Sequence, residues 1–465
     1  MNNNSNDKKF FNIIKIINDK YYTNWVKHLK EKILYTSRQK DLYEDPLNLI
    51  FIQFKLVESI SNIEKAIKEG KLKNKNKDSG LSYNYSIFLH KQLARIIKVI
   101  ADGIAWRVLG FDRPFLRIMS EERRYPSSVQ LSTHDFKNTQ IEAFKLVLRN
   151  DSKVLLNDIT NYLRFGDLLE IKGKETIIHE LKKSGKKVIN LNKIYEQIKS
   201  NPKAKISKQI RKLVAAQIAR NERVIITNKS PIKILDLDIE FTNNLKDIED
   251  LINVSKKNLY SSGEFGNYLR VSCFNILKLA KDIKKWKKYI DVDIKGATKF
   301  KKDEIVLPIS NFDTYYDEKG NFARNSTPYS IYPFKIDDCM SLLDGGYHLL
   351  SVINYSEIKR LFNKKGWEIV SRDKNFEQVV KENKKIIPNL FNGEIFQKRI
   401  DEIYFRLKRD NFFIDVPLTY IIRIGTDFLK PEVLLNAYEM IYEQSKPGVE
   451  SLFVFYILGE KKVWV

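Results

Sequence analysis

The chain has 465 residues, of which 43% are hydrophobic and 12% aromatic, enough to form ordered cores over most of its length. Its formal net charge of +24, from 82 Lys and Arg against 58 Asp and Glu, points to a polyanionic partner such as nucleic acid. A genome rich in A and T would raise the Lys content as well, since Asn and Ile are also abundant. The only two cysteines, Cys273 and Cys339, exclude a disulfide framework and a Cys-rich zinc site.

The sequence also argues against a membrane protein. Its polar start, MNNNSNDKKFF, lacks the apolar segment of a secretory signal. The longest apolar stretch, Ser86 to Leu109, is interrupted by His90, Lys91, Arg95, Lys98 and Asp102, which excludes a membrane-spanning helix. We therefore expect a cytoplasmic protein with no membrane association.

Residues 1–132 are predicted to form a helical N-terminal region. FFNIIKII and PLNLIFIQFKLVESISNIEKAI have the periodicity of amphipathic helices. Lys68–Gly80 contains a single Leu as its only apolar anchor and is predicted to be a flexible loop. A second long helical pattern ends at Gly110, a residue that commonly stops helices, and Pro114 and Pro126 interrupt the connection that follows.

Residues 133–275 are predicted to form an α/β domain. A helix over Asn138–Arg149 precedes short strands that are broken by Gly166 and Gly173. A basic helix over Lys205–Asn221 and the β-rich run RVIIT follow.

Residues 276–465 are predicted to form an α+β C-terminal domain with a recognition or regulatory role. Turn residues and aromatics combine in ARNSTPYSIYPF and in LLDGGYH. These segments could recognise bases or a partner protein. The alternative is that they are strands and loops of an ordinary core.

The most informative pattern lies in the segment Asp158–Lys187. Two apolar-rich runs, DLLEIK and TIIHELK, are separated by Gly-Lys-Glu, which predicts a β-hairpin. A turn centred between Gly173 and Lys174 sets the register of the two strands. The expected opposed pairs are Asp167 with Glu180, Leu169 with Ile178, and Ile171 with Thr176.

One face of this hairpin carries Asp167, Glu180 and Lys182 at its open end, because side chains alternate along a strand. Opposed Cβ atoms lie about 4.5–5.5 Å apart, so the two carboxylates could share one divalent cation. Mg²⁺ prefers such hard oxygen ligands. It would stabilise charge on a reacting phosphate and lower the pKa of a bound water, which Lys182 could orient or deprotonate.

The arrangement resembles the PD-(D/E)XK nuclease superfamily, on Gly166-Asp167 and Glu180-Leu181-Lys182. The resemblance covers about residues 138–228 and implies a restriction-endonuclease-like core, a mixed sheet flanked by helices. It also implies phosphodiester hydrolysis with Mg²⁺ or Mn²⁺, with Asp167 and Glu180 as metal ligands and Lys182 as the catalytic lysine. The backbone carbonyl of Leu181 would complete the metal site. Gly166 stands where the family has Pro.

Gln217 is the polar exception on the apolar stripe of the predicted helix Lys205–Asn221. Many members of that superfamily place a Gln or Lys there, so Gln217 is either a catalytic residue or a buried structural amide. Between Lys172 and Arg223 there are 15 Lys and Arg against 4 Asp and Glu. The residues expected to bind nucleic acid are Lys183, Lys186, Lys187, Lys205, Lys208, Arg211 and Lys212.

A second register would pair Asp158 with Glu170 and Lys172. It requires a turn near Arg164, where the hairpin signal is weaker. Asp158, Asn161 and Arg164 could instead form a loop near the site, or serve as structural caps. His179 falls on the face opposite Glu180 and is expected to be packed or solvated rather than catalytic.

These patterns predict a metal-dependent endonuclease that cleaves DNA, or RNA, in restriction or phage defence. DNA is the favoured partner, and the flanking domains would contact a protein or a second copy of the chain. The alternative is a non-catalytic nucleic-acid-binding protein that retains the nuclease fold. In a third interpretation the C-terminal domain is the main functional part, with the nuclease as its effector.

Overall fold

The computed structural model describes residues 19–73, 80–120, 134–163, 166–173, 175–181, 194, 196–197, 200, 208–225, 232–279, 306–310, 327–371, 404–444, 452–453 and 455–457. They form helices and small, mainly antiparallel sheets. The chain divides into two compact units. The first, called here the hairpin unit, is mainly Asn18–Ile234 with Pro328–Ile331, and the second, the C-terminal unit, is mainly Leu235–Thr327 with Tyr332–Val463. No helix within the described residues is long and apolar enough to cross a bilayer.

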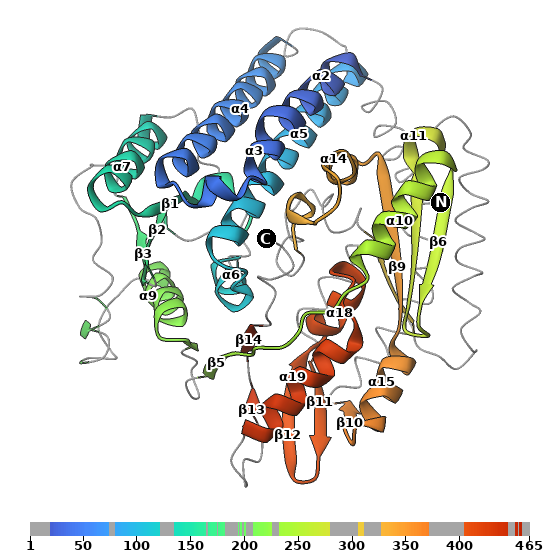
Figure 1. Cartoon of the computed structure of the whole chain (residues 1–465). Helices are drawn as coiled ribbons and strands as arrows, with labels where there is room; N and C mark the ends of the chain where they lie inside the picture. The colour runs from blue at the N-terminus through green and yellow to red at the C-terminus, as the bar shows by residue number, and fades with distance from the viewer. Residues whose placement is uncertain are drawn as a thin grey trace. The chain divides into compact units, whose positions relative to one another are not determined.

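The hairpin unit begins with helices, as predicted, although the predicted helix FFNIIKII lies outside the described residues. They are α2 (Lys20–His28), η1 (Leu29–Leu34), α3 (Tyr35–Ser37), η2 (Lys40–Tyr43), α4 (Pro46–Lys73), α5 (Gly80–Val108), α6 (Arg113–Ser120) and α7 (His134–Asn150). The long helices α4 and α5 lie side by side (Figure 1). The loop predicted over Lys68–Gly80 was wrong for its first part, because α4 continues to Lys73. Lys, Glu and Leu favour helix even without an apolar face.

Helix α5 ends as the sequence predicts. Gly110 has a φ of +64° and follows the last turn. Its N–H donates to Arg107 O over 3.0 Å, and Phe111 N–H donates to Trp106 O over 2.9 Å, which is a Schellman motif. Pro114 lies in the first turn of α6, where a helix needs no N–H donor, so it begins a helix rather than interrupting the connection.

A three-stranded antiparallel sheet, in the order β1-β2-β3, follows α7. Its strands are β1 (Lys153–Leu156), β2 (Leu168–Lys172) and β3 (Glu175–His179). The predicted pairs Leu169 with Ile178 and Ile171 with Thr176 are confirmed. The hairpin turn also has its predicted place, and Gly173 adopts a φ of +60° there. Glu170 pairs with Val154 of β1, so the second register, with Asp158 opposite Glu170, does not form.

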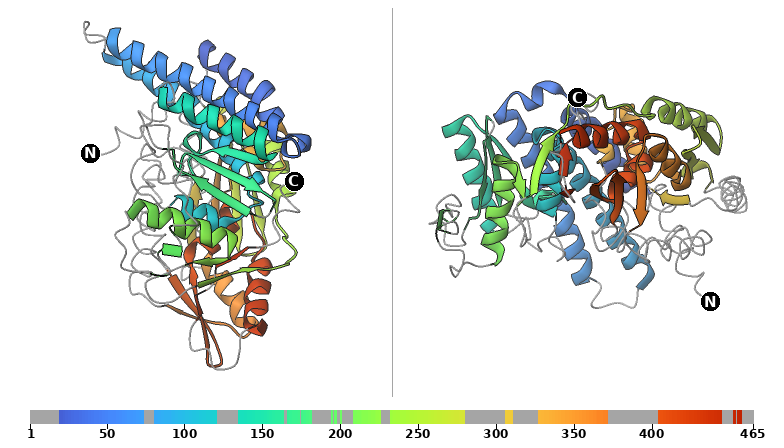
Figure 2. Two further views of the ribbon diagram at one scale, coloured as in Figure 1. Left: turned by 90° about the vertical axis from the view of Figure 1, so that its left-hand side faces the viewer. Right: turned by 90° about the horizontal axis from the view of Figure 1, so that it is seen from below.

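Helices pack at both edges of this sheet. Helices α4 and α7 contact β1, and α9 (Lys208–Asn221) contacts β3 (Figures 1 and 2). The predicted C-terminal end of α9 at Asn221 is confirmed, whereas residues 205–207 lie outside the described residues. Leu213, Val214 and Ile218 form part of its buried stripe, as expected.

Side-chain amides from these helices bond the outer edges of the sheet. At β1, Gln53 of α4 donates to Val154 O and accepts from Leu156 N, both over 2.8 Å. At β3, Asn221 accepts from Thr176 N and donates to Thr176 O, both over 3.0 Å. A sheet edge otherwise presents unpaired backbone groups, so each amide takes the place of a neighbouring strand.

The mixed sheet that the nuclease resemblance implies is, within the described residues, an antiparallel sheet of three strands. The run RVIIT forms β4 (Val224–Ile225), which pairs antiparallel with β5 (Ile232–Asp236) and not with β3. The physical reason is that α9 side chains already bond the outer edge of β3 at Thr176 and at Ile178.

The two compact units do not follow the boundaries predicted at residues 132 and 275. Gln53 bonds β1 directly, so the N-terminal helices share a core with the hairpin. The chain passes into the C-terminal unit at Leu235.

The C-terminal unit contains two four-stranded sheets and is mixed α and β, as expected. The first has the order β6-β7-β9-β8 and is antiparallel; the second has the order β10-β11-β12-β13, in which β12 and β13 are parallel. The strands of the unit are β6 (Tyr260–Phe265), β7 (Leu269–Asn275), β8 (Val306–Ser310), β9 (Tyr347–Asn354), β10 (Glu368–Ser371), β11 (Tyr404–Arg409), β12 (Phe412–Pro417), β13 (Leu452–Phe453) and β14 (Phe455–Ile457). Its helices are α10 (Leu245–Lys257), α11 (Ile276–Leu279), α14 (Ile336–Asp344), α15 (Tyr355–Lys364), α18 (Leu418–Thr426) and α19 (Pro431–Gln444).

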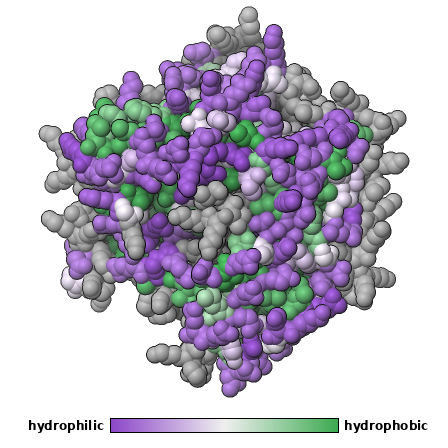
Figure 3. Space-filling view, in the orientation of Figure 1, coloured by the Kyte–Doolittle hydropathy of each residue, from purple (hydrophilic) through white to green (hydrophobic). Residues whose placement is uncertain are grey.

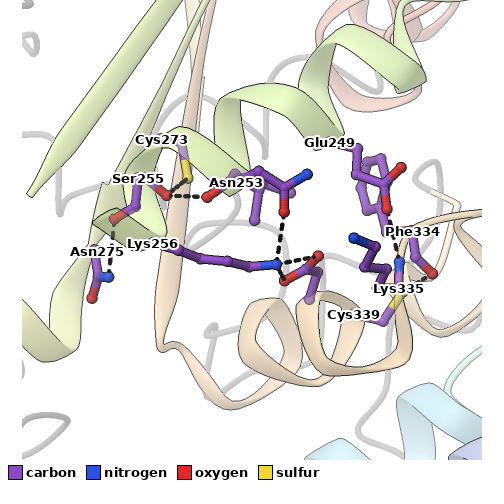
Figure 4. A network of polar contacts seen from close by, with 11 residues as sticks. Glu249, Asn253, Ser255, Lys256, Cys273, Asn275, Phe334, Lys335 and Cys339 are labelled. Atoms are coloured by element: carbon purple, nitrogen blue, oxygen red, sulfur yellow. Dashed lines mark hydrogen bonds and ion pairs between the residues drawn. The ribbon is translucent and has the colours of Figure 1, made fainter. Parts of the chain in front are cut away.

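A polar network joins α10 to α14 in this unit (Figure 4). Lys256 Nζ lies 2.7 Å from Asp338 Oδ1 and donates to Asn253 Oδ1 over 2.8 Å. Asp338 is completely buried. Removing Lys256 would leave the buried charge of Asp338 uncompensated and destabilise this contact between the two helices.

The two aromatic segments considered for recognition contribute to cores. In the described part of ARNSTPYSIYPF, Tyr329, Tyr332 and Phe334 are buried, and in LLDGGYH, Tyr347 and His348 are buried. These rings are therefore not available as an exposed stacking surface, which favours the ordinary-core alternative.

The exposed apolar side chains of the hairpin unit include several on α4 and α7. Phe51 and Phe144 have ring centroids 6.0 Å apart, and Ile141 and Leu148 are more than half exposed. The face drawn in Figure 3 is otherwise largely hydrophilic, with scattered apolar areas. Since α4 and α7 pack at the β1 edge, this apolar surface is separate from the basic helix at the β3 edge.

We predict that Gln53→Met, which retains the side-chain volume, lowers the free energy of unfolding by roughly 2–4 kcal/mol, because two buried backbone groups of β1 lose their partner. Denaturant unfolding would measure this change, together with faster amide exchange at Leu156. The control is Glu58→Ala on the exposed face of the same helix, expected within about 0.5 kcal/mol of wild type. Equal stability of Gln53→Met and wild type would contradict the edge-bonding role.

Candidate functional site

Gly166 shapes the start of β2. Its φ is +71°, a backbone conformation that favours glycine. A Cβ atom at this position would lie 2.5 Å from Ile178 Cγ2 and 3.0 Å from His179 O. Proline, whose ring holds φ near −65°, cannot adopt this conformation. The positive φ at position 166 thus explains why this chain has Gly where the PD-(D/E)XK nuclease superfamily has Pro.

Asp167 bonds to the residues on both sides of Glu180. The regular ladder ends at Leu168 and His179, one pair short of the predicted Asp167–Glu180 pair. Beyond it, Asp167 N donates to His179 O over 2.8 Å, and Asp167 Oδ2 accepts from Leu181 N. The backbone and the side chain of Asp167 therefore hold the Glu180 segment beside it. The two acidic residues that the sequence singles out are neighbours.

A third carboxylate, Asp158, belongs to this group. It lies in the short helix η4 (Asn157–Ile159) after β1, and its negative charge acts on both Asp167 and Glu180. Asn157 joins η4 to the start of β2, since its N–H donates to Asp167 O over 3.1 Å and its Nδ2 to Gly166 O over 3.2 Å. From the sequence alone, Asp158 is expected either in a loop near the site or as a structural cap. Pairing KVLL of β1 with LLEI of β2 would have placed it at this end of the sheet.

Burial and mutual repulsion perturb the carboxyl groups of the site. Burial raises the pKa of Asp167 to about 6; the N–H of Leu181 opposes this and the charge of Asp158 adds to it. Burial raises the pKa of Glu180 to about 7, and the charges of Asp167 and Asp158 raise it further. A nearby cation would favour the charged form of each carboxyl.

The oxygen donors of this group fit a hard divalent cation. In the described part of the chain, no set of three or more His, Cys, Asp or Glu side chains is arranged to hold a metal ion. Mg²⁺, however, is usually bound through one or two carboxylates, with waters and substrate phosphates as the other ligands. Asp167 and Glu180 provide these two carboxylates. Lys182 lies outside the described residues.

The reverse face of the hairpin carries a buried polar network. His179 Nε2 lies 2.8 Å from Glu170 Oε2, and Glu170 Oε1 accepts from Asn150 Nδ2 over 2.7 Å and from Ser152 Oγ over 2.8 Å. The hydrogen bond from His179, with those from Asn150 and Ser152, lowers the pKa of Glu170 to about 2 despite burial. His179 is packed against Glu170, as expected for this face. Glu170 therefore has a structural role in this network, which argues against the second register, in which Glu170 would pair with Asp158.

Gln217 contacts the hairpin from α9. It is 6% exposed, and its Oε1 accepts from Ile178 N over 3.3 Å. This bond accounts for a polar residue on an apolar stripe and supports the structural alternative; a catalytic role for Gln217 stays a prediction.

The predicted nucleic-acid-binding residues that the structure describes lie on α9. Arg211 and Lys212 are half-buried near its N-terminal end. Lys208 is the first residue of the helix. The remaining predicted nucleic-acid-binding residues, which lie outside the described residues, are Lys183, Lys186, Lys187 and Lys205.

Comparisons of the chain with family models, with curated proteins and with solved structures found no match.

Proposed function

We propose that the hairpin unit is a metal-dependent endonuclease whose site is formed by Asp167 and Glu180, with Asp158 beside them. The observation that carries this proposal is the pair of bonds from Asp167 to His179 O and Leu181 N, on either side of Glu180. Two carboxylates kept so close on a half-buried surface repel each other, and a divalent cation offsets that cost.

Each residue of the proposed site would have a separate role in cleavage. Asp167 and Glu180 would bind Mg²⁺ or Mn²⁺, and the Leu181 N–H holds the Asp167 carboxylate in place. The cation, when bound, stabilises charge on the phosphate and lowers the pKa of water. Lys182 would orient or deprotonate the attacking water, and the Leu181 carbonyl would complete the metal site. Arg211 and Lys212 of α9 would contact the phosphate backbone.

The resemblance to the PD-(D/E)XK nuclease superfamily adds support from the sequence. With Asp167 at the open end of the hairpin beside Glu180 and Leu181, and with Lys182 next in the sequence, the register supports that resemblance. A restriction-endonuclease-like core is also part of the proposal, although the described part of the sheet has three antiparallel strands where the resemblance implies a mixed sheet.

Nucleic acid is the proposed substrate, and DNA is favoured over RNA. The net charge of +24 would strengthen binding to phosphate backbones. A role in restriction or phage defence would fit a cutting domain that is joined to a large second unit, which could contact a protein or a second copy of the chain.

A cleavage assay on plasmid DNA, single-stranded DNA and RNA, with Mg²⁺, Mn²⁺ or EDTA, tests this proposal. Asp167→Ala, Glu180→Ala and Lys182→Ala should each lower the cleavage rate at least about 100-fold, because each removes a ligand or the lysine of the site. The matched control is Glu175→Ala, an exposed acidic residue at the turn of the same hairpin, which should cut like wild type.

Two other outcomes would change the assignment. A wild-type protein that binds nucleic acid but never cuts would favour the non-catalytic binding protein. Metal-dependent cutting that survives all three alanine substitutions would exclude this hairpin as the active site.

The raised pKa values predict a pH-dependent metal affinity, since protons compete with the cation for both carboxylates. With a pKa of about 7 for Glu180 and about 6 for Asp167, both groups ionise as the pH rises from 6 to 8. The dissociation constant for Mn²⁺ should then fall roughly 20-fold, about tenfold from Glu180 and about twofold from Asp167. Calorimetric titration at each pH would measure it. An affinity independent of pH over this range would contradict the shared carboxylate site.

A further inference from the structure

The loop that carries Asp158 is anchored at a distance from the hairpin. Between β1 and β2 the chain forms η4 and then continues through Thr160, Asn161, Tyr162 and Leu163. Within the loop, Thr160 Oγ1 donates to Asn157 O over 2.9 Å and accepts from Leu163 N, also over 2.9 Å. These bonds link the two ends of residues 157–163, so that the position of one end of the loop depends on the position of the other.

Asp102 of α5 holds this segment from the other side. Its carboxylate accepts from Asn161 N over 2.6 Å, from Asn161 Nδ2 over 2.7 Å and from Tyr162 N over 3.3 Å. Asp102 is 1% exposed. The contact joins the C-terminal part of α5 to the loop between β1 and β2. Asp102 and Asn161 are more than fifty positions apart in the sequence.

Burying the Asp102 carboxylate carries a desolvation cost. Burial raises its pKa to about 7, although the bonds from Asn161 and Tyr162 and the charge of Lys98 act in the opposite direction. An apolar residue at this position of α5 would avoid the desolvation cost of a carboxylate. The buried carboxylate of Asp102 accepts its hydrogen bonds from N–H groups of one loop. Its role is therefore to fix the position of that loop.

We propose that Asp102 is a positioning residue for the carboxylate site: by holding Asn161 and Tyr162 it keeps Asp158 beside Asp167 and Glu180. The inference rests on the proposed metal site and assigns to α5 a part in its geometry. Asp102 does not itself touch the metal or the substrate. It acts through the loop, whose other end is fixed at Gly166 and Asp167 by Asn157.

The first test is the affinity of the metal-free protein for Mn²⁺ by calorimetry, without nucleic acid. Asp102→Asn removes the acceptor for Asn161 Nδ2 and should raise the dissociation constant roughly tenfold, as outer-shell substitutions commonly do. The exchanged double variant, Asp102→Asn with Asn161→Asp, reverses the direction of that side-chain bond. It should restore the affinity to within about threefold of wild type.

A double-mutant cycle with Asp158→Asn then tests the route of the effect. If Asp102 acts through Asp158, adding Asp102→Asn to Asp158→Asn should cause no further loss of affinity. Additive losses would overturn the proposal, as would an unchanged affinity in Asp102→Asn. Asn161→Ala, which removes only the side-chain bond, replaces Asp102→Asn if that variant does not fold.

The matched control is Asp338→Asn, which breaks a buried ion pair in the C-terminal unit and leaves the loop intact. It should lose stability but keep the affinity for Mn²⁺. The outcome is separable from that of the nuclease proposal. A wild-type protein that binds Mn²⁺ but does not cut excludes the nuclease while the cycle still tests Asp102; a wild-type protein that binds no Mn²⁺ overturns both.

Discussion

The hairpin depends on how the two open edges of a three-stranded sheet are bonded. A sheet this small leaves backbone N–H and C=O groups unpaired on its outer strands, and burying such groups without partners is costly. Gln53 supplies partners to two backbone groups of β1, and on β3 Asn221 supplies two and Gln217 a third. Helices therefore take the place of neighbouring strands. Helix α4 packs at β1 because it carries Gln53, and α9 packs at β3 because it carries Gln217 and Asn221.

The same constraint divides the hairpin into two faces with different electrostatics. On the reverse face, Glu170 is ionised, because His179, Asn150 and Ser152 each bond its carboxylate. At the open end, burial raises the pKa values of Asp167 and Glu180, and the charges of neighbouring carboxylates add to this. The charge of Glu170 is thus stabilised by hydrogen bonds within the protein, whereas under our proposal a cation stabilises the charges of Asp167 and Glu180.

The N-terminal helices belong to this arrangement rather than to a separate module. Helix α4 contributes Gln53 to the edge of β1, and α5 contributes Asp102 to the loop before β2. Each is a polar residue on an otherwise apolar helix face, and each bonds backbone groups of the sheet or its loop. Residues that would break a purely apolar stripe therefore specify where the hairpin docks against the helices.

The sequence by itself determined the hairpin, its register, the stop at Gly110 and the pairing of Asp167 with the Glu180 segment, because turn residues and alternation act over a few positions. Only the tertiary structure decided that Asp158 joins the site and that Gln53, Asp102 and Asn221 bond the sheet. It also decided that β4 pairs with β5 instead of extending the hairpin sheet. These contacts link residues far apart in the chain, and a local pattern carries no information about which distant backbone groups need a partner.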